Sequence, residues 1–157
     1  MRRYLLFLFL TLSLTPAGAQ PKYEVRAAWV TAVYGLDWPQ TKATTPAGIR
    51  RQQEELIEIL DKLKAANFNT VLFQTRTRGD VLYKSSIEPY NSILTGKVDG
   101  DPGYDPLAFA VRECHKRGME CHAWMVALPL GNKKHVAKLG NKSVTKKRKE
   151  ICIPYKN

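Results

Sequence analysis

The chain has 157 residues, with 25 Lys and Arg against 14 Asp and Glu, and its formal net charge is +11. Most of this excess lies in residues 132–157, which carry nine basic residues and one acid, whereas residues 20–131 carry 14 basic and 13 acidic residues. A nearly neutral main part excludes a basic surface over the whole domain. The tail lacks interleaved aromatic side chains that could stack on bases, so we expect a solvated basic loop and no nucleic-acid partner.

The N-terminus has the pattern of a secretory signal peptide. Two arginines precede an eleven-residue, mostly apolar stretch at residues 4–14, and Ala17-Gly18-Ala19 follows as a small-residue cleavage site. The apolar stretch is short for a bilayer span, and no cysteine follows it closely to carry a lipid, so we expect no stable membrane anchor. The sequence therefore predicts a signal peptide at residues 1–19, cleavage after Ala19, and a secreted or periplasmic domain at residues 20–157.

The first predicted strand covers residues 25–34 (VRAAWVTAVY), which are apolar and contain no Gly or Pro. The turn-rich segment after it holds an acid, Asp37, beside an indole, Trp38. A helix is predicted to begin at Pro46, because Thr45 is a favourable cap and proline suits the first helical position. Apolar residues then recur at helical spacing as far as Leu63.

The second strand begins at Thr70 and is followed by densely spaced polar residues. Its apolar, β-branched start is typical of a strand that is buried on both faces, as in a parallel sheet. The polar residues after it include Gln74, Arg76, Arg78, Asp80 and Tyr83. Because α/β proteins bind ligands at the carboxyl ends of their strands, this stretch predicts the edge of a site. Arg76 and Asp80 either pair with each other to hold a loop or contact a substrate.

A loop of about twenty residues follows, and loops of this length are usually functional or disordered. Asp105 is then predicted to cap a second helix, which ends at Gly118. The third predicted strand, residues 119–128, places His122 and Trp124 near its carboxyl end. The remainder is polar and basic, with one short helix predicted at residues 133–139.

The order β-α-β-α-β, with short loops after the helices and long polar loops after the strands, predicts a parallel sheet with right-handed crossovers. No G-x-G-x-x-G follows the first strand, which argues against a dinucleotide-binding fold and leaves no cofactor indicated. We therefore predict an α/β fold, a partial (β/α)8 TIM barrel with its first three strands and two helices plus a basic, loop-rich tail. A complete barrel needs ~250 residues, so we expect an N-terminal, truncated part of such a domain.

The cysteines give no metal-binding signature. Cys114, Cys121 and Cys152 are odd in number and match no zinc spacing, so we interpret them as structural thiols and predict no metal site. Whether Cys114 and Cys121 pair is left open.

The predicted strand ends would bring eight candidate substrate-binding residues toward one rim. They are Asp37, Trp38, Arg76, Arg78, Asp80, Tyr83, His122 and Trp124. Both tryptophans could instead belong to the core, and His122 could be a hydrogen-bonded residue behind the site. Glycoside hydrolysis requires two carboxylates, and only Asp37 and Asp80 lie close behind strand ends, so no catalytic pair is assigned.

Three segments resemble the glycosyl-hydrolase-like 10 domain family. They are EVRAAWVT at residues 24–31, FNTVLFQTRTRGDVLY at residues 68–83 and DPLAFAVRECHKRGMECHAW at residues 105–124. The resemblance implies an exported bacterial TIM-barrel glycosidase-like protein with a carbohydrate substrate. It matches Arg76, Arg78, Gly79, Asp80 and Tyr83 to the family's segment after the second strand, and His122, Ala123 and Trp124 to its third-strand signature.

The resemblance also implies that the family's catalytic acids follow a later strand, beyond the end of this chain. We therefore expect an exported glycoside hydrolase-like fragment that acts on poly- or oligosaccharide but is inactive by itself. One alternative is a glycan-binding barrel protein without catalysis. Another is a module that binds anionic polymers through its basic tail by counterion release.

Overall fold

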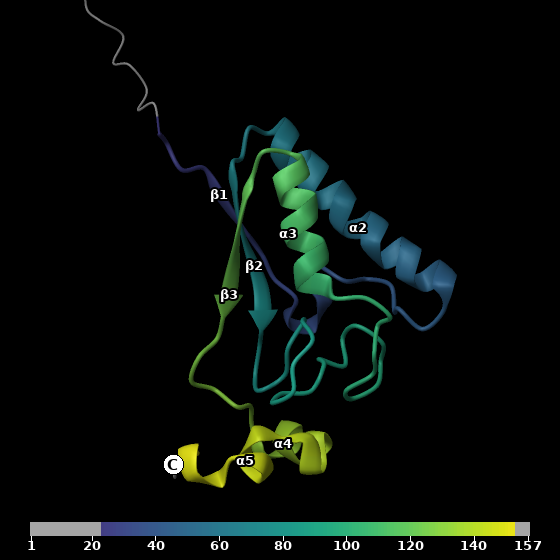
Figure 1. Ribbon diagram of the computed structural model, residues 1–157, viewed down its shortest axis with the longest axis vertical. Helices are drawn as coiled ribbons and strands as arrows, with labels where there is room; N and C mark the ends of the chain where they lie inside the picture. Colours follow the sequence, from purple (N-terminus) through teal and green to yellow (C-terminus); the bar gives the residue numbers. More distant parts are fainter. Residues whose placement is uncertain (1–22, 153–157) are drawn as a thin grey trace, which may run out of the picture.

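The computed structural model describes residues 23–152, so the predicted signal peptide at residues 1–19 lies outside the described residues. The described chain contains a three-stranded parallel sheet in the order β1-β2-β3 (Figure 1). The strands are β1 (Ala27–Val30), β2 (Thr70–Arg76) and β3 (Glu120–Met125). The predicted parallel α/β arrangement is confirmed for these three strands. A (β/α)8 barrel has eight strands, so this sheet could form only part of one.

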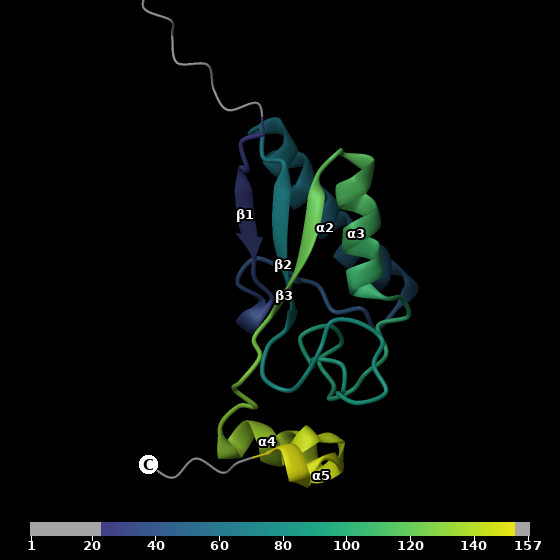
Figure 2. The same cartoon turned by 60° about the vertical axis from the view of Figure 1, so that its left-hand side comes forward.

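Helices α2 (Pro46–Ala65) and α3 (Pro106–Lys116) both cover one face of the sheet, as the views in Figures 1 and 2 show. The predicted caps are present: Thr45 Oγ1 accepts from the Gly48 amide at 3.0 Å, and Asp105 Oδ1 accepts from the Ala108 amide at 3.0 Å. Each cap satisfies an amide that the first helical turn leaves without a partner. Gly118, with φ +61°, ends α3 as predicted because this left-handed conformation favours glycine.

The hydrophobic core lies between the sheet and these two helices. Val71 and Phe73 of β2 point toward the helices, where Leu56 and Leu60 of α2 are 0–1% exposed. From α3, Phe109 and Cys114 enter the same cluster. The apolar periodicity of the two helices therefore faces the sheet, as the sequence predicts.

Strand β1 is shorter than predicted, because a side chain takes over its backbone hydrogen bonds. The Gln74 side-chain oxygen Oε1 accepts from the amides of Ala32 and Val33 at 2.9 and 3.0 Å, and from Thr31 Oγ1 at 2.7 Å. With these amides bound to a side chain, the chain leaves the sheet after Val30 and turns.

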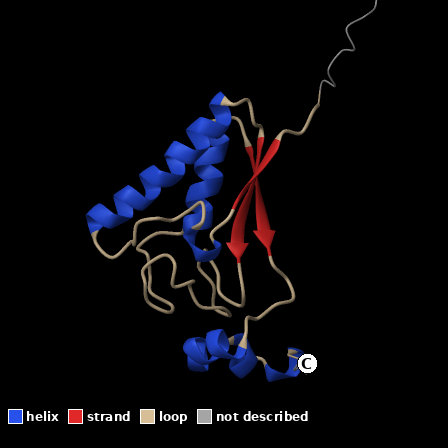
Figure 3. Ribbon diagram, turned by 180° about the vertical axis from the view of Figure 1, so that it is seen from behind, coloured by secondary structure: helices blue, strands red, loops and turns tan. Residues whose placement is uncertain are grey.

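The other face of the sheet carries no helix in the described chain (Figure 3). On this face Trp29, Leu72 and His122 stand at one level, and Trp124 stands one level further along. Trp29 is 60% exposed, and its ring meets that of Trp124 edge to face at 4.7 Å. Among the described residues, no further strand pairs with the outer edge of β3. The apolar side chains of this open face therefore remain in contact with solvent.

The C-terminal segment contains more helix than predicted. The predicted helix at residues 133–139 is present as α4 (Lys133–Leu139), and α5 (Val144–Lys147) follows it, with the 3-10 turns η2 (Gly140–Lys142) and η3 (Lys149–Ile151). A further 3-10 turn, η1 (Val33–Gly35), lies after β1. Both short helices sit beyond the carboxyl ends of the strands, against the long loop after β2 (Figure 2). Lys142 Nζ binds Asp99 Oδ2 at 2.7 Å, and Lys147 Nζ donates to the Ile87 carbonyl at 3.1 Å.

The three cysteine thiols are free. Cys114 of α3 and Cys121 of β3 both lie in the core between the helices and the sheet. The neighbouring Cys121 thiol, followed by burial, raises the pKa of the Cys114 thiol, whereas the Cys114 thiol lowers the pKa of Cys121. None of the helices within residues 23–152 combines the length and the hydropathy that a membrane span requires.

Candidate functional site

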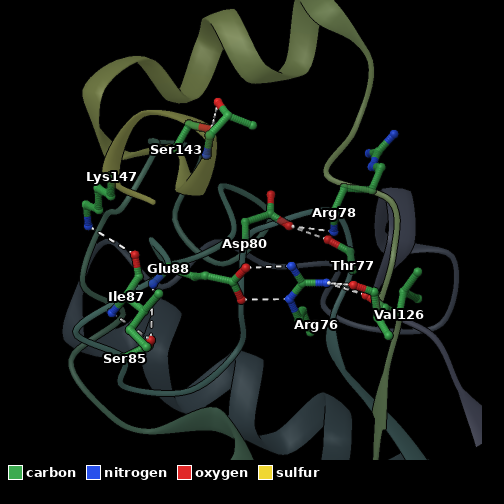
Figure 4. A network of polar contacts seen from close by, with 12 residues as sticks. Arg76, Thr77, Arg78, Asp80, Ser85, Ile87, Glu88, Val126, Ser143 and Lys147 are labelled. Carbon is green, nitrogen blue, oxygen red and sulfur yellow. Dashed lines mark hydrogen bonds and ion pairs between the residues drawn. The ribbon is translucent and has the colours of Figure 1, made fainter. Parts of the chain in front are cut away.

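A buried ion pair organises the carboxyl end of β2. Arg76 Nε and Nη2 donate to the two oxygens of Glu88 at 2.7 and 2.6 Å (Figure 4). The two side chains are only 9% and 10% exposed. Arg76 Nη1 also donates to the carbonyls of Val126 and Ala127, in the segment after β3. One guanidinium thus joins the end of β2, the long loop and the exit of β3, and its pKa is raised mainly by the hydrogen bonds to Glu88.

Asp80 does not pair with Arg76. Of the two roles that the sequence left open for these residues, pairing with each other is therefore wrong. The Asp80 carboxylate accepts from Thr77 Oγ1 and from the Arg78 amide (Figure 4). It also lies 3.5 Å from His135 Nε2. It is 3% exposed. Gly79, with φ +77°, allows the tight turn that brings these groups together. Asp80 therefore holds the turn after β2 and connects it to α4.

A hollow of about 370 Å³ opens beside this turn. Its lining includes Tyr34, Lys42, Arg78, Asp80, His135 and Lys138. The Arg78 guanidinium stands over the Tyr34 ring, 5.1 Å from its centroid, and Nη1 donates to the Tyr34 hydroxyl at 3.2 Å. His135 Nε2 lies 3.1 Å from the Arg78 carbonyl. The loops after β1 and β2 and the segment after β3 thus meet at one hollow.

Asp37 and Trp38 both follow β1, but Asp37 lies at the surface and Trp38 in the core. Asp37 is exposed, and its Oδ2 accepts from the Thr31 amide at 2.8 Å, which holds the turn. Trp38 is 0% exposed, its Nε1 donates to the Gln52 carbonyl at 2.8 Å, and its ring packs 5.6 Å from that of Phe73. The structure therefore places Trp38 in the core. Its prediction as a substrate-binding residue at the rim is wrong, and the alternative position in the core is confirmed.

His122 and Trp124 lie on the open face of the sheet and not in the hollow. His122 is exposed, and its Nε2 lies 3.0 Å from Glu120 Oε2 on the same face. Trp124 is half-buried against Trp29. Tyr83 is half-buried in the loop after β2; burial, followed by the charge of Glu88, raises the pKa of its phenol. The eight predicted residues therefore divide between the rim, the open face and the core.

Sequence reasoning missed two residues that shape this region, namely Glu88 and His135, and it did not predict the contact of Gln74 with the backbone after β1. Glu88 lies in the long loop after β2, and no local pattern connects it with an arginine twelve positions earlier. His135 lies in a helix that was predicted without a role. Within residues 23–152, no three His, Cys, Asp or Glu side chains converge closely enough to hold a metal ion.

The fold and the site define a class: a parallel α/β protein with charged side chains gathered where its strands end. A family model described as glycosyl hydrolase-like 10 matches residues 24–154, and the chain belongs to this glycosyl hydrolase-like family. The resemblance seen in the sequence is thereby confirmed.

Named relatives agree with this assignment. Glycosyl hydrolase YngK of Bacillus subtilis (strain 168) is 41% identical over 108 residues, which cover 69% of this chain and 21% of that protein. Glycosyl hydrolase DigH of Escherichia coli (strain K12) is 39% identical over 120 residues, covering 69% of this chain and 27% of that protein. The DigH of Shigella flexneri matches to the same extent. The chain thus spans roughly a quarter of the length of the curated relatives it matches.

Proposed function

We propose that this chain forms part of an exported glycoside hydrolase-like protein, in which the carboxyl ends of β1, β2 and β3 supply one side of a carbohydrate-binding cleft. The observation that carries this proposal is the hollow beside Arg78 and Asp80, which lies at the strand ends of a chain belonging to a glycosyl hydrolase-like family. Ligands of parallel α/β folds bind at this edge of the sheet. The polar hollow and the exposed ring of Tyr34 suit a sugar, which presents hydroxyls and one apolar face.

We propose further that the sheet is the first part of a (β/α)8 barrel. Three features support this: the strands are parallel, both helices cover the same face (Figure 1), and the other face carries the exposed Trp29 and the half-buried Leu72 in positions that a barrel interior would cover. The relatives are several times longer than the matched region, which leaves room for the remaining strands.

The acids near the strand ends are occupied by structural contacts. Asp37 and Asp80 each hold a turn, Glu88 neutralises Arg76, and Asp105 caps α3. Hydrolysis of a glycosidic bond needs one carboxyl group as acid and a second as base or nucleophile. We therefore propose that the catalytic pair is not among these residues and that the 157-residue chain does not hydrolyse glycans by itself.

The same observation favours a second candidate, a glycan-binding protein without catalysis. A longer protein containing this segment should separate the two. Release of reducing ends from a panel of polysaccharides would support the hydrolase, and saturable binding without release would support the binding protein. Turnover by the purified 157-residue chain would contradict the proposal that its acids are structural.

Export is tested separately by expressing the protein with its N-terminus intact. We expect the exported fraction to begin at Gln20, which N-terminal sequencing would show directly. A protein that retains residues 1–19 in the cytoplasm would contradict the proposed signal peptide.

A further inference from the structure

We propose that the hollow beside Tyr34 and Arg78 binds an anionic substituent of a glycan, a carboxylate or a sulfate, through three cations. This inference rests on the proposed carbohydrate function and specifies the chemistry of its ligand. Lys42 comes from the loop after β1, Arg78 from the turn after β2 and Lys138 from α4. Residues far apart in the sequence thus place like charges around one hollow, which is unfavourable unless an anion balances them.

The hydrogen bonds of these cations use neutral acceptors. Lys42 Nζ donates to the Ile93 carbonyl at 2.7 Å, Lys138 Nζ to Ser92 Oγ at 3.3 Å, and Arg78 to the Tyr34 hydroxyl. Within residues 23–152, none of the three forms a salt bridge, whereas Lys142 on the same tail is paired with Asp99. These cations are therefore held in position while their charge stays available.

Nearby carboxylates do not cancel this charge. Asp80, the acid in the lining, is buried and directed to Thr77, the Arg78 amide and His135. Glu55 acts on Lys42 only at longer range, because its oxygens accept from the backbone amides of Gln40 and Thr41 and from the Thr41 hydroxyl. Three cations against one buried acid leave the hollow positive at neutral pH.

Arg78 offers the most specific contact. Its Nε is buried and has no hydrogen-bond partner among the described residues. A buried donor without an acceptor is costly, and an oxyanion is the acceptor that a guanidinium binds best. The planar fork matches the two oxygens of a carboxylate or sulfate, while the exposed Tyr34 ring beside it can pack on a sugar face.

The test uses three short oligosaccharides as probes: an oligogalacturonate, its fully methyl-esterified neutral form, and a sulfated galactan oligosaccharide. Binding is measured on the full chain, immobilised so that its molecules do not contact each other, at fixed ionic strength. We expect one or both anionic probes to bind at least about tenfold more tightly than the neutral ester. The anionic probe that binds more tightly identifies carboxylate or sulfate as the ligand group.

Variants then localise the binding. Lys42→Gln and Lys138→Gln, both on exposed side chains, should each weaken binding of the anionic probe by about three- to tenfold and leave binding of the neutral ester unchanged. Arg78→Gln should abolish the preference for the anion. Lys146→Gln is the matched control, because it removes the same charge from the exposed tail outside the hollow, and we expect a change of less than about twofold.

Three results would overturn the inference in different ways. Equal binding of neutral and anionic probes would reject the anion site and leave the proposed carbohydrate function intact. A loss on Lys146→Gln as large as that on Lys138→Gln would replace the site with unspecific attraction to the tail. Failure of all three probes to bind would reject the inference together with this part of the proposed function.

Discussion

Arg76 and Glu88 form the contact on which the geometry of the strand ends depends most. Both are about nine-tenths buried, and the arginine also holds two carbonyls after β3. Their joint burial is tolerable because each charge neutralises the other, so loss of either side chain leaves the remaining charge buried without a partner.

We therefore expect Arg76→Ala and Glu88→Ala each to lower the free energy of unfolding by about 3–5 kcal/mol. Urea denaturation monitored by circular dichroism would measure the change. Lys142→Ala, which breaks the exposed pair with Asp99, is the control and should cost less than about 1 kcal/mol. If the two buried-pair variants were as stable as this control, the contact would not organise the strand ends.

The two interior cysteines should differ in reactivity. The neighbouring Cys114 thiol lowers the pKa of Cys121, which favours the reactive thiolate form of Cys121. We expect iodoacetamide to label Cys121 readily and Cys114, which is fully buried and whose pKa is raised, only after unfolding. Mass spectrometry of the labelled peptides would follow both.

Cys114→Ala removes the neighbouring thiol that lowers the pKa of Cys121 and should therefore slow the labelling of Cys121 at pH 7. Cys152 serves as the internal reference, because the substitution does not touch it. Equal labelling rates of Cys121 with and without Cys114 would show that the Cys114 thiol does not set the reactivity of Cys121.

At the scale of elements, Glu113 stabilises the C-terminal turn of α3 through ion pairs with basic residues of that turn. It is 6% exposed and binds Lys116 at 2.8 Å and Arg117 at 3.1 Å, while Arg117 reaches Asp61 of α2 at 2.6 Å. The bond to Lys116 is the main cause that lowers the pKa of Glu113. A carboxyl group whose pKa is lower in the folded state stabilises the fold above its unfolded pKa, and this contribution disappears as the pH falls through the folded value.

Glu113→Gln should therefore lower the free energy of unfolding by about 1–3 kcal/mol at pH 7. The difference from the parent protein should shrink as the pH drops below the ordinary glutamate range, near about 4. Urea denaturation at pH 7 and at pH 3 would reveal it. Glu54→Gln on the exposed side of α2 is the control, and a pH-independent effect of Glu113→Gln would contradict the linkage.

At the scale of the whole molecule, the open face of the sheet is the feature that we expect to govern association in solution. Trp29 is exposed, and Leu72 and Trp124 are half-buried, so this face leaves apolar surface beside the uncovered edge of β3. Exposed apolar patches and uncovered strand edges both promote association. The two helices cover the opposite face, so this tendency is confined to one side of the molecule.

We therefore expect the 157-residue chain to self-associate at micromolar concentration. Sedimentation velocity would detect oligomers, and Trp29→Lys should reduce them by placing a charge on the open face. Leu128→Lys is the control, because Leu128 is 90% exposed but lies after β3. A monomeric parent chain with sharp, dispersed amide NMR signals would contradict the expectation.

Local sequence determined the helices, the strand order and the position of the polar rim, because helix caps, apolar periodicity and strand composition act over a few residues. Thr45 and Asp105 could be assigned from their neighbours alone. Only the tertiary structure decided that Arg76 pairs with Glu88, that Gln74 ends β1 and that Trp38 is buried. These outcomes depend on which distant groups meet when the loops fold over the strand ends, and no short-range pattern carries that information.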